Sequence, residues 1–305
     1  MTNYTGAAPA VPDSRPPGGS AGPPCGTLVP VSDFRAAAVD AARAAGRLLR
    51  DARGGVRRIE HKGVINIVTE MDRRSEALIV ERLLGAYPDH AVLAEESGAI
   101  EAPAGRRSEY RWHVDPLDGT TNYAHGVPIY AVSIALERAG TLILGVAYDP
   151  SHDECWVAER GKGATLDGEP VRVSGCASLD QSLLVTGFPY DIRTTDETNL
   201  AEYALLSMRS QAVRRLGSAV LDLCYVACGR LEAFWELTLG PWDMAAGGLI
   251  VLEAGGRVTD VHGGPWRLDG PGILASNGLV HDPLLEALAE ARRPGATPGS
   301  RATGP

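Results

Sequence analysis

The stretch DPLDGTTN, residues 115–122, constrains the structure and chemistry of this chain more than any other segment. Two aspartates stand three residues apart, and Pro116 between them fixes the local backbone and lacks an N–H. We predict a turn that aims both carboxylates at one point, with the Leu117 carbonyl beside them. Gly119 allows close approach to the backbone, and Thr120 begins a helix whose N–H groups favour an anion. The segment therefore pairs oxygen ligands suited to Mg²⁺ with a site for a phosphate.

Two further acidic segments gain their meaning from this one. EES, residues 95–97, follows a predicted strand, where side chains alternate between faces, so one glutamate can face a metal. WDMAAG, residues 242–247, places Asp243 at the start of an apolar helix. Taken alone, the first is typical of a solvated loop and the second of an ordinary acid at a helix N-terminus.

Composition limits the class of protein. The chain has 305 residues, 44% hydrophobic and 22% charged, with a net charge of −9. This balance disfavours a nucleic-acid binder, which usually carries a basic face. No apolar run is long enough for a membrane span, and no secretory signal is expected. The five cysteines form no metal or redox spacing, so we expect a cytoplasmic protein.

The chain is predicted to contain one ordered domain between two tails. Residues 1–30 and 293–305 are rich in Pro, Gly, Ala and Ser and are expected to be disordered. Residues 31–292 would form the catalytic domain. We expect it to comprise an N-terminal α+β part, about 31–180, and a C-terminal α/β part, about 181–292.

Hydrophobic spacing and turn residues predict helices and strands along the whole domain. Helices are expected at 33–52, 72–87, 197–210, 218–228, 243–253 and 283–291. Strands are expected at 91–94, 111–114, 131–137, 142–149, 154–159, 182–186, 233–236 and 272–276. The strands at 131–137, 142–149 and 154–159 should form an antiparallel set. The pattern indicates an α+β fold of alternating layers.

Taken together, the motifs resemble the inositol monophosphatase family of Mg²⁺-dependent, lithium-sensitive sugar phosphatases. The resemblance runs from about Phe34 to Leu288. It includes GSA at 217–219, EAGG at 253–256 and a segment from Lys62 to Asp72. It implies a layered αβαβα sugar-phosphatase fold, two or three Mg²⁺ ions, a small phosphate ester as substrate and a homodimer.

The resemblance also implies a role for each motif. The metal ligands would be Glu95, Asp115, the Leu117 carbonyl, Asp118 and Asp243. The catalytic residues at the attacking water would be Thr120, Asp72 and Glu95. The substrate contacts would come from Asp118, Gly119, Thr120, Ser218, Ala219 and Glu236.

Two departures from the family pattern affect what the resemblance implies. Asn66 stands where relatives often carry Asp, which would weaken an auxiliary metal, and Ala94 stands where Gly is usual. The implied reaction is hydrolysis of inositol monophosphate to inositol and phosphate by a metal-activated water. Other esters stay open as substrates: fructose 1,6-bisphosphate, histidinol phosphate or a nucleotide 3′-phosphate. A regulatory relative without turnover is the remaining alternative.

Overall fold

A computed structural model describes residues 31–53, 59–61, 67–102 and 108–293. The predictions for both tails, and those for Lys62 and Asn66, lie outside the described residues, apart from Arg293. Among the described helices, none combines the length and the apolar composition that crossing a membrane would require.

The larger of the two main sheets has eight strands, and it holds most of the acidic segments. Its order is β10-β9-β8-β7-β6-β5-β3-β4, and all neighbours are antiparallel except the parallel pair β3 and β5. The strands are β3 (Ala91–Ala94), β4 (Gly98–Ile100), β5 (Tyr110–Asp118), β6 (Ala131–Arg138), β7 (Thr141–Asp149), β8 (Glu154–Glu159), β9 (Gly163–Leu166) and β10 (Glu169–Pro170). The predicted antiparallel set is confirmed as β6, β7 and β8.

The smaller sheet has five strands in the order β12-β11-β13-β15-β14. Strand β11 pairs in parallel with β12 and β13, whereas β15 is antiparallel to β13 and β14. The strands are β11 (Leu183–Thr186), β12 (Ala212–Arg214), β13 (Ala233–Glu236), β14 (Arg257–Thr259) and β15 (Ile273–Ser276). A separate hairpin joins β1 (Ile59–His61) to β2 (Ile67–Thr69). The predicted boundary near residue 180 falls between the two main sheets, and the division into two parts stays a prediction.

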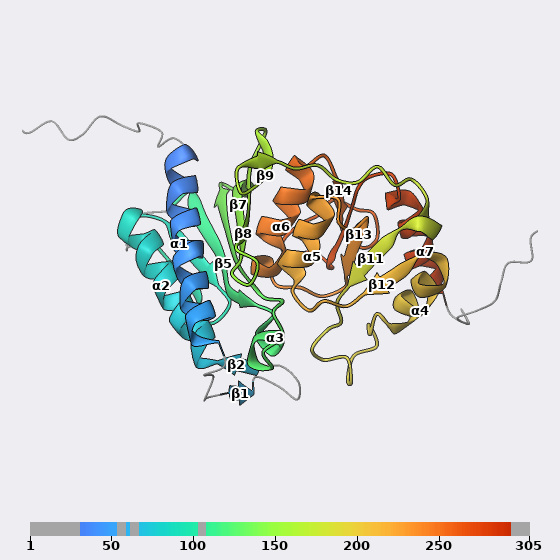
Figure 1. The fold of residues 1–305 in the computed structure, drawn as a ribbon, viewed down its shortest axis with the longest axis horizontal. Helices are drawn as coiled ribbons and strands as arrows, with labels where there is room; N and C mark the ends of the chain where they lie inside the picture. The colour runs from blue at the N-terminus through green and yellow to red at the C-terminus, as the bar shows by residue number, and fades with distance from the viewer. Residues whose placement is uncertain (1–30, 54–58, 62–66, 103–107, 294–305) are drawn as a thin grey trace, which may run out of the picture. The chain divides into compact units, whose positions relative to one another are not determined.

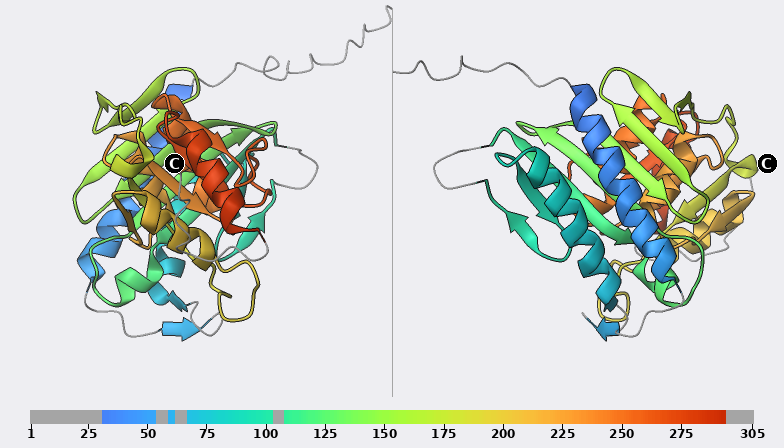
Figure 2. Two further views of the ribbon diagram at one scale, coloured as in Figure 1. Left: turned by 90° about the vertical axis from the view of Figure 1, so that its right-hand side faces the viewer. Right: turned by 60° about the vertical axis from the view of Figure 1, so that its left-hand side comes forward.

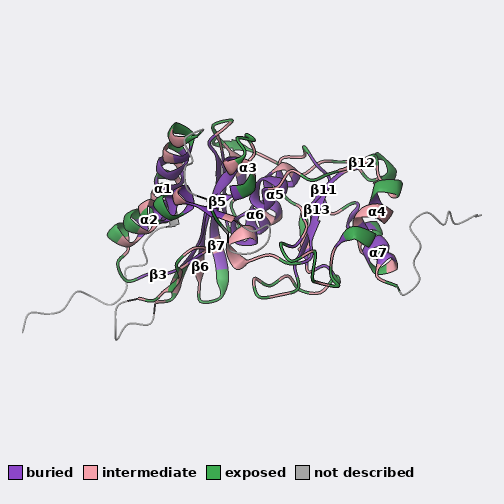
Figure 3. Cartoon of the chain, turned by 90° about the horizontal axis from the view of Figure 1, so that it is seen from below, coloured by how far each residue is buried: buried purple, intermediate pink, exposed green. Residues whose placement is uncertain are grey.

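The helices form three layers around these sheets (Figures 1 and 3). Helices α1 and α2 run side by side over one face of the larger sheet (Figure 2), α5 and α6 lie between the sheets, and α4 and α7 cover the far face of the smaller sheet. Their bounds are α1 (Val31–Ala52), α2 (Glu70–Ala86), α4 (Leu200–Arg209), α5 (Ala219–Ala227), α6 (Pro241–Glu253) and α7 (His281–Ala291); α3 (Thr120–Ala124) is short. The predicted αβαβα layering is confirmed.

Side-chain size on the two faces of the larger sheet explains this layering. On β6, Val132 and Ile134 pack toward α1 and α2, whereas Ala131 and Ala135 pack toward α5 and α6. Neighbouring residues of a strand face opposite sides of the sheet, so alternate residues of the same strand belong to two different hydrophobic cores. The small residues let α6 approach closely: a Cβ on Gly145 of β7 would lie 2.8 Å from the Ala246 carbonyl oxygen.

Each of the three cores contains one fully buried tryptophan. Trp112 packs beneath α1 and α2, Trp156 lies in the central core, and Trp235 lies beneath α4 and α7. Burial of such large apolar side chains is the main source of stability in each layer.

Several boundaries differ from those predicted, each for a local reason. Helix α1 begins at Val31, two residues before the predicted start. Helices α6 and α7 begin earlier than predicted because a proline is tolerated in the first turn. The predicted turn at Pro116 is wrong, since β5 continues through it to Asp118.

Candidate active site

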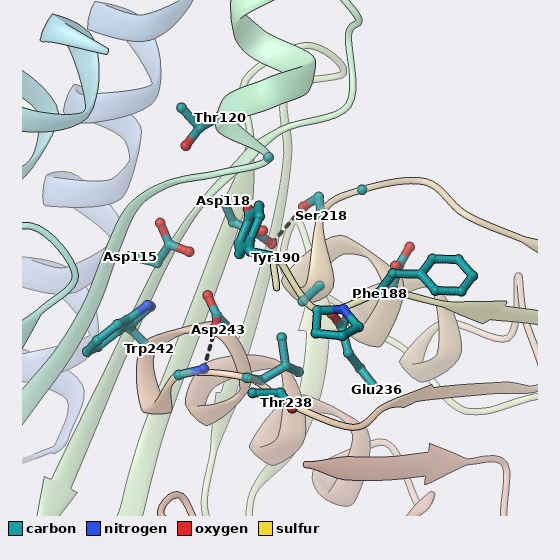
Figure 4. A pocket seen from close by; sticks show the side chains of 18 of the residues that line it. Asp115, Asp118, Thr120, Phe188, Tyr190, Ser218, Glu236, Thr238, Trp242 and Asp243 are labelled. Atoms are coloured by element: carbon teal, nitrogen blue, oxygen red, sulfur yellow. Dashed lines mark hydrogen bonds between the residues drawn. The ribbon is translucent and has the colours of Figure 1, made fainter. Parts of the chain in front are cut away.

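A cavity of about 340 Å³ lies where the ends of several strands meet the beginnings of two helices. Glu95 follows β3, Asp118 ends β5, Glu236 ends β13, and α5 and α6 both begin at the cavity. Figure 4 shows the labelled carboxylates arranged around one space. Every predicted site residue except Asp72 lines it: Glu95, Asp115, Leu117, Asp118, Gly119, Thr120, Ser218, Ala219, Glu236 and Asp243.

A β-bulge in β5 brings its two aspartates to this cavity. Asp115 pairs with Ser133 and Asp118 with Ala131, so the step along β5 is one residue longer than the step along β6. An extra residue of this kind bends the strand and re-aims its side chains. The Asp115 Oδ1 atom accepts a hydrogen bond of 2.9 Å from the Leu117 N–H and stabilises the bulge.

Gly119 follows the bulge in a conformation that favours glycine. Its φ is +92°, in the left-handed region. A Cβ there would also lie 2.9 Å from the Ile129 carbonyl oxygen. Both observations show that this position needs a residue without a side chain.

Thr120 and Asp72, which the family resemblance places together at the attacking water, are joined by a hydrogen bond. The Thr120 Oγ1 atom lies 2.7 Å from Asp72 Oδ1 and 3.0 Å from the Leu117 carbonyl oxygen. Asp72 Oδ2 accepts bonds of 2.8 and 2.6 Å from the N–H and hydroxyl of Thr69, which caps α2. The carboxylate is therefore held from two sides, and it orients the Thr120 hydroxyl.

Two other carboxylates are held by the beginnings of helices. Asp118 Oδ2 accepts bonds of 2.8 Å from Ser218 Oγ and 2.7 Å from the Val220 N–H, both at the start of α5. Asp243 Oδ2 accepts a bond of 2.6 Å from the Gly240 N–H, before α6. Figure 4 draws the bond between Ser218 and Asp118 and the bond from Gly240 to Asp243. At least one oxygen of each carboxylate is thus held by the backbone or a hydroxyl at a helix start.

The charges of these carboxylates are crowded. Burial, together with repulsion from Glu95, Asp118 and Asp243, raises the pKa of Asp115 well above its usual range. Burial raises the pKa of Asp118 to about 6, although the hydrogen bonds from α5 act in the opposite direction. The pKa of Asp243 is also raised, by burial and by repulsion from its neighbours. A cation in the cavity would relieve this repulsion.

The donor set fits Mg²⁺ by its chemistry. It consists of carboxylate oxygens and one carbonyl, which are the hard ligands that this ion prefers, and Mg²⁺ usually keeps several waters. Within residues 31–293, leaving out the segments that are not described, no three acidic, histidine or cysteine side chains form a ready-made ligand cluster. The carboxylates line the cavity and do not converge on a single point.

Glu236 lies at the other end of the cavity and is buried. A Cβ on Gly187 would lie 1.9 Å from the Glu236 Oε2 atom, so glycine at position 187 makes room for this carboxylate. Burial raises the pKa of Glu236 to about 8; the charge of Asp118 adds to the shift, and that of Arg215 opposes it.

The cavity also contains residues that the sequence did not indicate. Tyr190, on the segment after β11, is 56% exposed and lines the cavity together with Arg215. Asp222 of α5 is 1% exposed, and its Oδ1 atom has no hydrogen-bond partner among the described residues. A charged residue inside the apolar sequence of α5 was the one available signal for Asp222; Tyr190 and Arg215 carried none.

The layered fold and the acid-lined cavity together define a class of phosphatase. The model of the inositol monophosphatase family matches residues 31–294, and the chain belongs to that family. The prediction of the family is therefore confirmed. Enzymes of this family are phosphatases and are generally metal-dependent.

Individual relatives agree with this assignment. The inositol-1-monophosphatase of Synechocystis is 47% identical over 253 residues, which cover 83% of this chain and 87% of the relative. The protein named Nus factor SuhB from Pseudomonas aeruginosa is 45% identical over 255 residues, covering 82% and 94%. The solved inositol monophosphatase of Anabaena matches with a TM-score of 0.77 at 43% identity, covering 85% of this chain and 96% of that one.

Proposed function

We propose that this protein is a Mg²⁺-dependent phosphomonoesterase that hydrolyses inositol monophosphate to inositol and phosphate. The observation that carries the proposal is that Glu95, Asp115, Asp118 and Asp243 line one cavity together with Leu117 and Thr120. Relatives named inositol-1-monophosphatase support the choice of substrate.

The metal ligands in this proposal are Glu95, Asp115, the Leu117 carbonyl, Asp118 and Asp243, which would hold two or three ions. When bound, Mg²⁺ neutralises the charge of the phosphate, lowers the pKa of a bound water and stabilises the departing alkoxide. The cavity itself disfavours free carboxylate charge, as the raised pKa values of Asp115 and Asp243 indicate.

Thr120 and Asp72 would position the attacking water, with Glu95 on its other side. The Thr120 hydroxyl donates a hydrogen bond to Asp72, 2.7 Å away. Its lone pairs are then free to accept a hydrogen bond from a water in the cavity. Asp72 stays in place because α2 and Thr69 hold its second oxygen. The backbone N–H groups of Gly119 and Thr120 would bind the phosphate at the start of α3.

The polyol part of the substrate would occupy the end of the cavity near Glu236. The proposed contacts there are Asp118, Ser218, Ala219 and Glu236, all lining residues. Carboxylate oxygens accept hydrogen bonds from hydroxyls, and bonds to a charged acceptor are among the stronger ones. This end of the cavity would therefore favour an ester that carries several hydroxyls.

The experiment that tests the proposal is a panel of phosphate esters ranked by kcat/KM, with and without Mg²⁺. The panel should contain inositol 1-phosphate, fructose 1,6-bisphosphate, histidinol phosphate, a nucleotide 3′-phosphate and para-nitrophenyl phosphate. The proposal expects the inositol ester to rank first and every rate to vanish in excess EDTA. A different ester at the top would overturn the substrate, and the absence of any turnover would favour a regulatory role.

A further inference from the structure

Helix α2 carries three buried polar side chains that contact the segments next to the cavity. Asp72, Ser75 and Glu76 are 0%, 0% and 5% exposed, and their spacing of three and four residues places them on one face of the helix. Asp72 contacts Thr120, as described above. The contacts of the other two extend to the segments that carry the remaining proposed metal ligands.

Glu76 holds the backbone directly after Glu95. Its Oε2 atom accepts a hydrogen bond of 2.8 Å from the Glu96 N–H, and its Oε1 atom accepts one of 3.0 Å from the Ser97 N–H. The Glu95 N–H donates to the Val114 carbonyl oxygen of β5 at 3.1 Å. The backbone around Glu95 is thus fixed on one side to α2 and on the other to β5.

Ser75 makes the corresponding contact with β5. Its Oγ atom donates a hydrogen bond of 2.8 Å to the Pro116 carbonyl oxygen, between Asp115 and Leu117 in the bulge. One turn of α2 therefore contacts both the EES segment and the bulge. This turn therefore lies against both segments that carry the proposed metal ligands.

We propose that Glu76 is a positioning residue, which sets the place of Glu95 relative to Asp115 and Asp118 and so determines the affinity for Mg²⁺. The metal part of this inference rests on the proposed function. A buried carboxylate is costly unless it is well hydrogen-bonded, and here each oxygen faces one backbone N–H. Glutamine would keep one acceptor and turn its own NH₂ group toward the second N–H.

Two variants at this position and one elsewhere test the inference: Glu76→Ala, Glu76→Gln and the control Glu202→Gln. Glu202 is also 5% exposed, but it lies on α4 and pairs with Arg292 at 3.0 Å, outside the cavity. The first measurement is hydrogen exchange at the Glu96 and Ser97 amides in the metal-free protein. The second is the Mg²⁺ dissociation constant by calorimetry, without substrate.

We expect Glu76→Ala to accelerate exchange at both amides and to weaken Mg²⁺ binding by roughly 10- to 100-fold, as loss of a group that orients a ligand does. Glu76→Gln should give a smaller change in both quantities. Glu202→Gln should lower the Tm and leave Mg²⁺ binding unchanged.

Faster exchange with unchanged Mg²⁺ binding in Glu76→Gln would overturn the inference, because Glu76 would then hold only the turn. If Glu76→Ala does not fold, the Glu76→Gln result decides alone. Neither measurement uses turnover. A wild-type protein that binds Mg²⁺ but hydrolyses no ester would refute the proposed function and leave the role of Glu76 standing.

Discussion

Replacing Glu236 by glutamine should make the metal-free protein more stable at neutral pH while impairing its use of polyol esters. The carboxyl is buried beside Gly187, and its pKa is raised from 4.5 to about 8. Glutamine has nearly the same shape and no charge to bury. The wild-type protein must keep this carboxyl protonated when it folds at neutral pH, whereas the unfolded chain ionises it, and glutamine removes that cost.

The direction and the size of the change in stability follow from the raised pKa of Glu236. Because the folded-state pKa lies above the unfolded value, the stability that the wild-type Glu236 contributes is complete below about pH 4.5 and is lost as the pH rises toward 8. At about 1.4 kcal/mol per pKa unit, the loss reaches about 4 kcal/mol at the upper end of this range. Glu236→Gln should lack this loss.

The assay is urea unfolding of EDTA-treated wild type and Glu236→Gln at about pH 5 and about pH 8. The two proteins should be similarly stable at the lower pH, and the variant should be the more stable at the higher pH. Glu232→Gln is the control. Glu232 directly precedes β13 and is also buried, but its Oε2 atom accepts a hydrogen bond of 2.6 Å from the Leu183 N–H. Parallel pH curves for wild type and Glu236→Gln would refute the reasoning.

The same variant tests the proposed substrate contact. In the working enzyme the positive charge of bound Mg²⁺ would favour the ionised form of Glu236. Hydrogen bonds to a charged group contribute about 1.5–3 kcal/mol, so kcat/KM for an inositol phosphate should fall roughly ten- to a hundredfold. Para-nitrophenyl phosphate, which has no neighbouring hydroxyls, should lose much less, and the Mg²⁺ concentration for half-maximal activity should barely move. Equal losses for both esters would show that Glu236 supports metal binding or the fold and is not a contact of the polyol hydroxyls.

Three further changes have defined outcomes. Asp118→Asn should lower kcat by about a thousandfold with little change in Tm, because an oxygen can still accept from Ser218 and Val220; retention of a tenth of the activity would contradict the assignment. Gly119→Ala should cost about 1–3 kcal/mol in urea unfolding, since φ is +92° and a Cβ meets the Ile129 carbonyl; an unchanged midpoint would be inconsistent with this strain. Deleting residues 1–30 should leave kcat and Tm nearly unchanged, and a drop of several degrees would show that the tail packs on the domain.

The sequence predicted elements whose signal is local. Strands β3, β8 and β13 have the predicted bounds, because each is a short apolar or alternating run between turn residues. Strands β9, β12 and β14 were missed, since three or four residues carry too little pattern and become strands only by pairing with a neighbour. The bulge at Asp115 and Asp118 was mistaken for a turn because a bulge is defined by the register with β6.

The candidate site divides in the same way. Asp115 and Asp118 were found because the segment DPLDGTTN has an unusual local composition. Glu95 and Asp243 gained their meaning only beside that segment, and the roles of Asp72 and Glu236 came from the family resemblance. Asp222 and Tyr190 reach the cavity from α5 and from the segment after β11, and only the packing of the layers brings them there. The role of Glu76 could not be predicted from the sequence for the same reason, because its partners, the amides of residues 96 and 97, are brought to it by tertiary structure.

Phosphate release from inositol 1-phosphate, measured as Mg²⁺ is titrated into the metal-free protein, tests the central claim most directly. We expect no turnover without metal, a saturable rise in rate as Mg²⁺ is added, and complete loss of turnover on chelation with EDTA. Asp118→Asn should show almost no rise at any Mg²⁺ concentration. Turnover that persists in excess EDTA, or a wild type that stays inactive when saturated with Mg²⁺, would contradict the account.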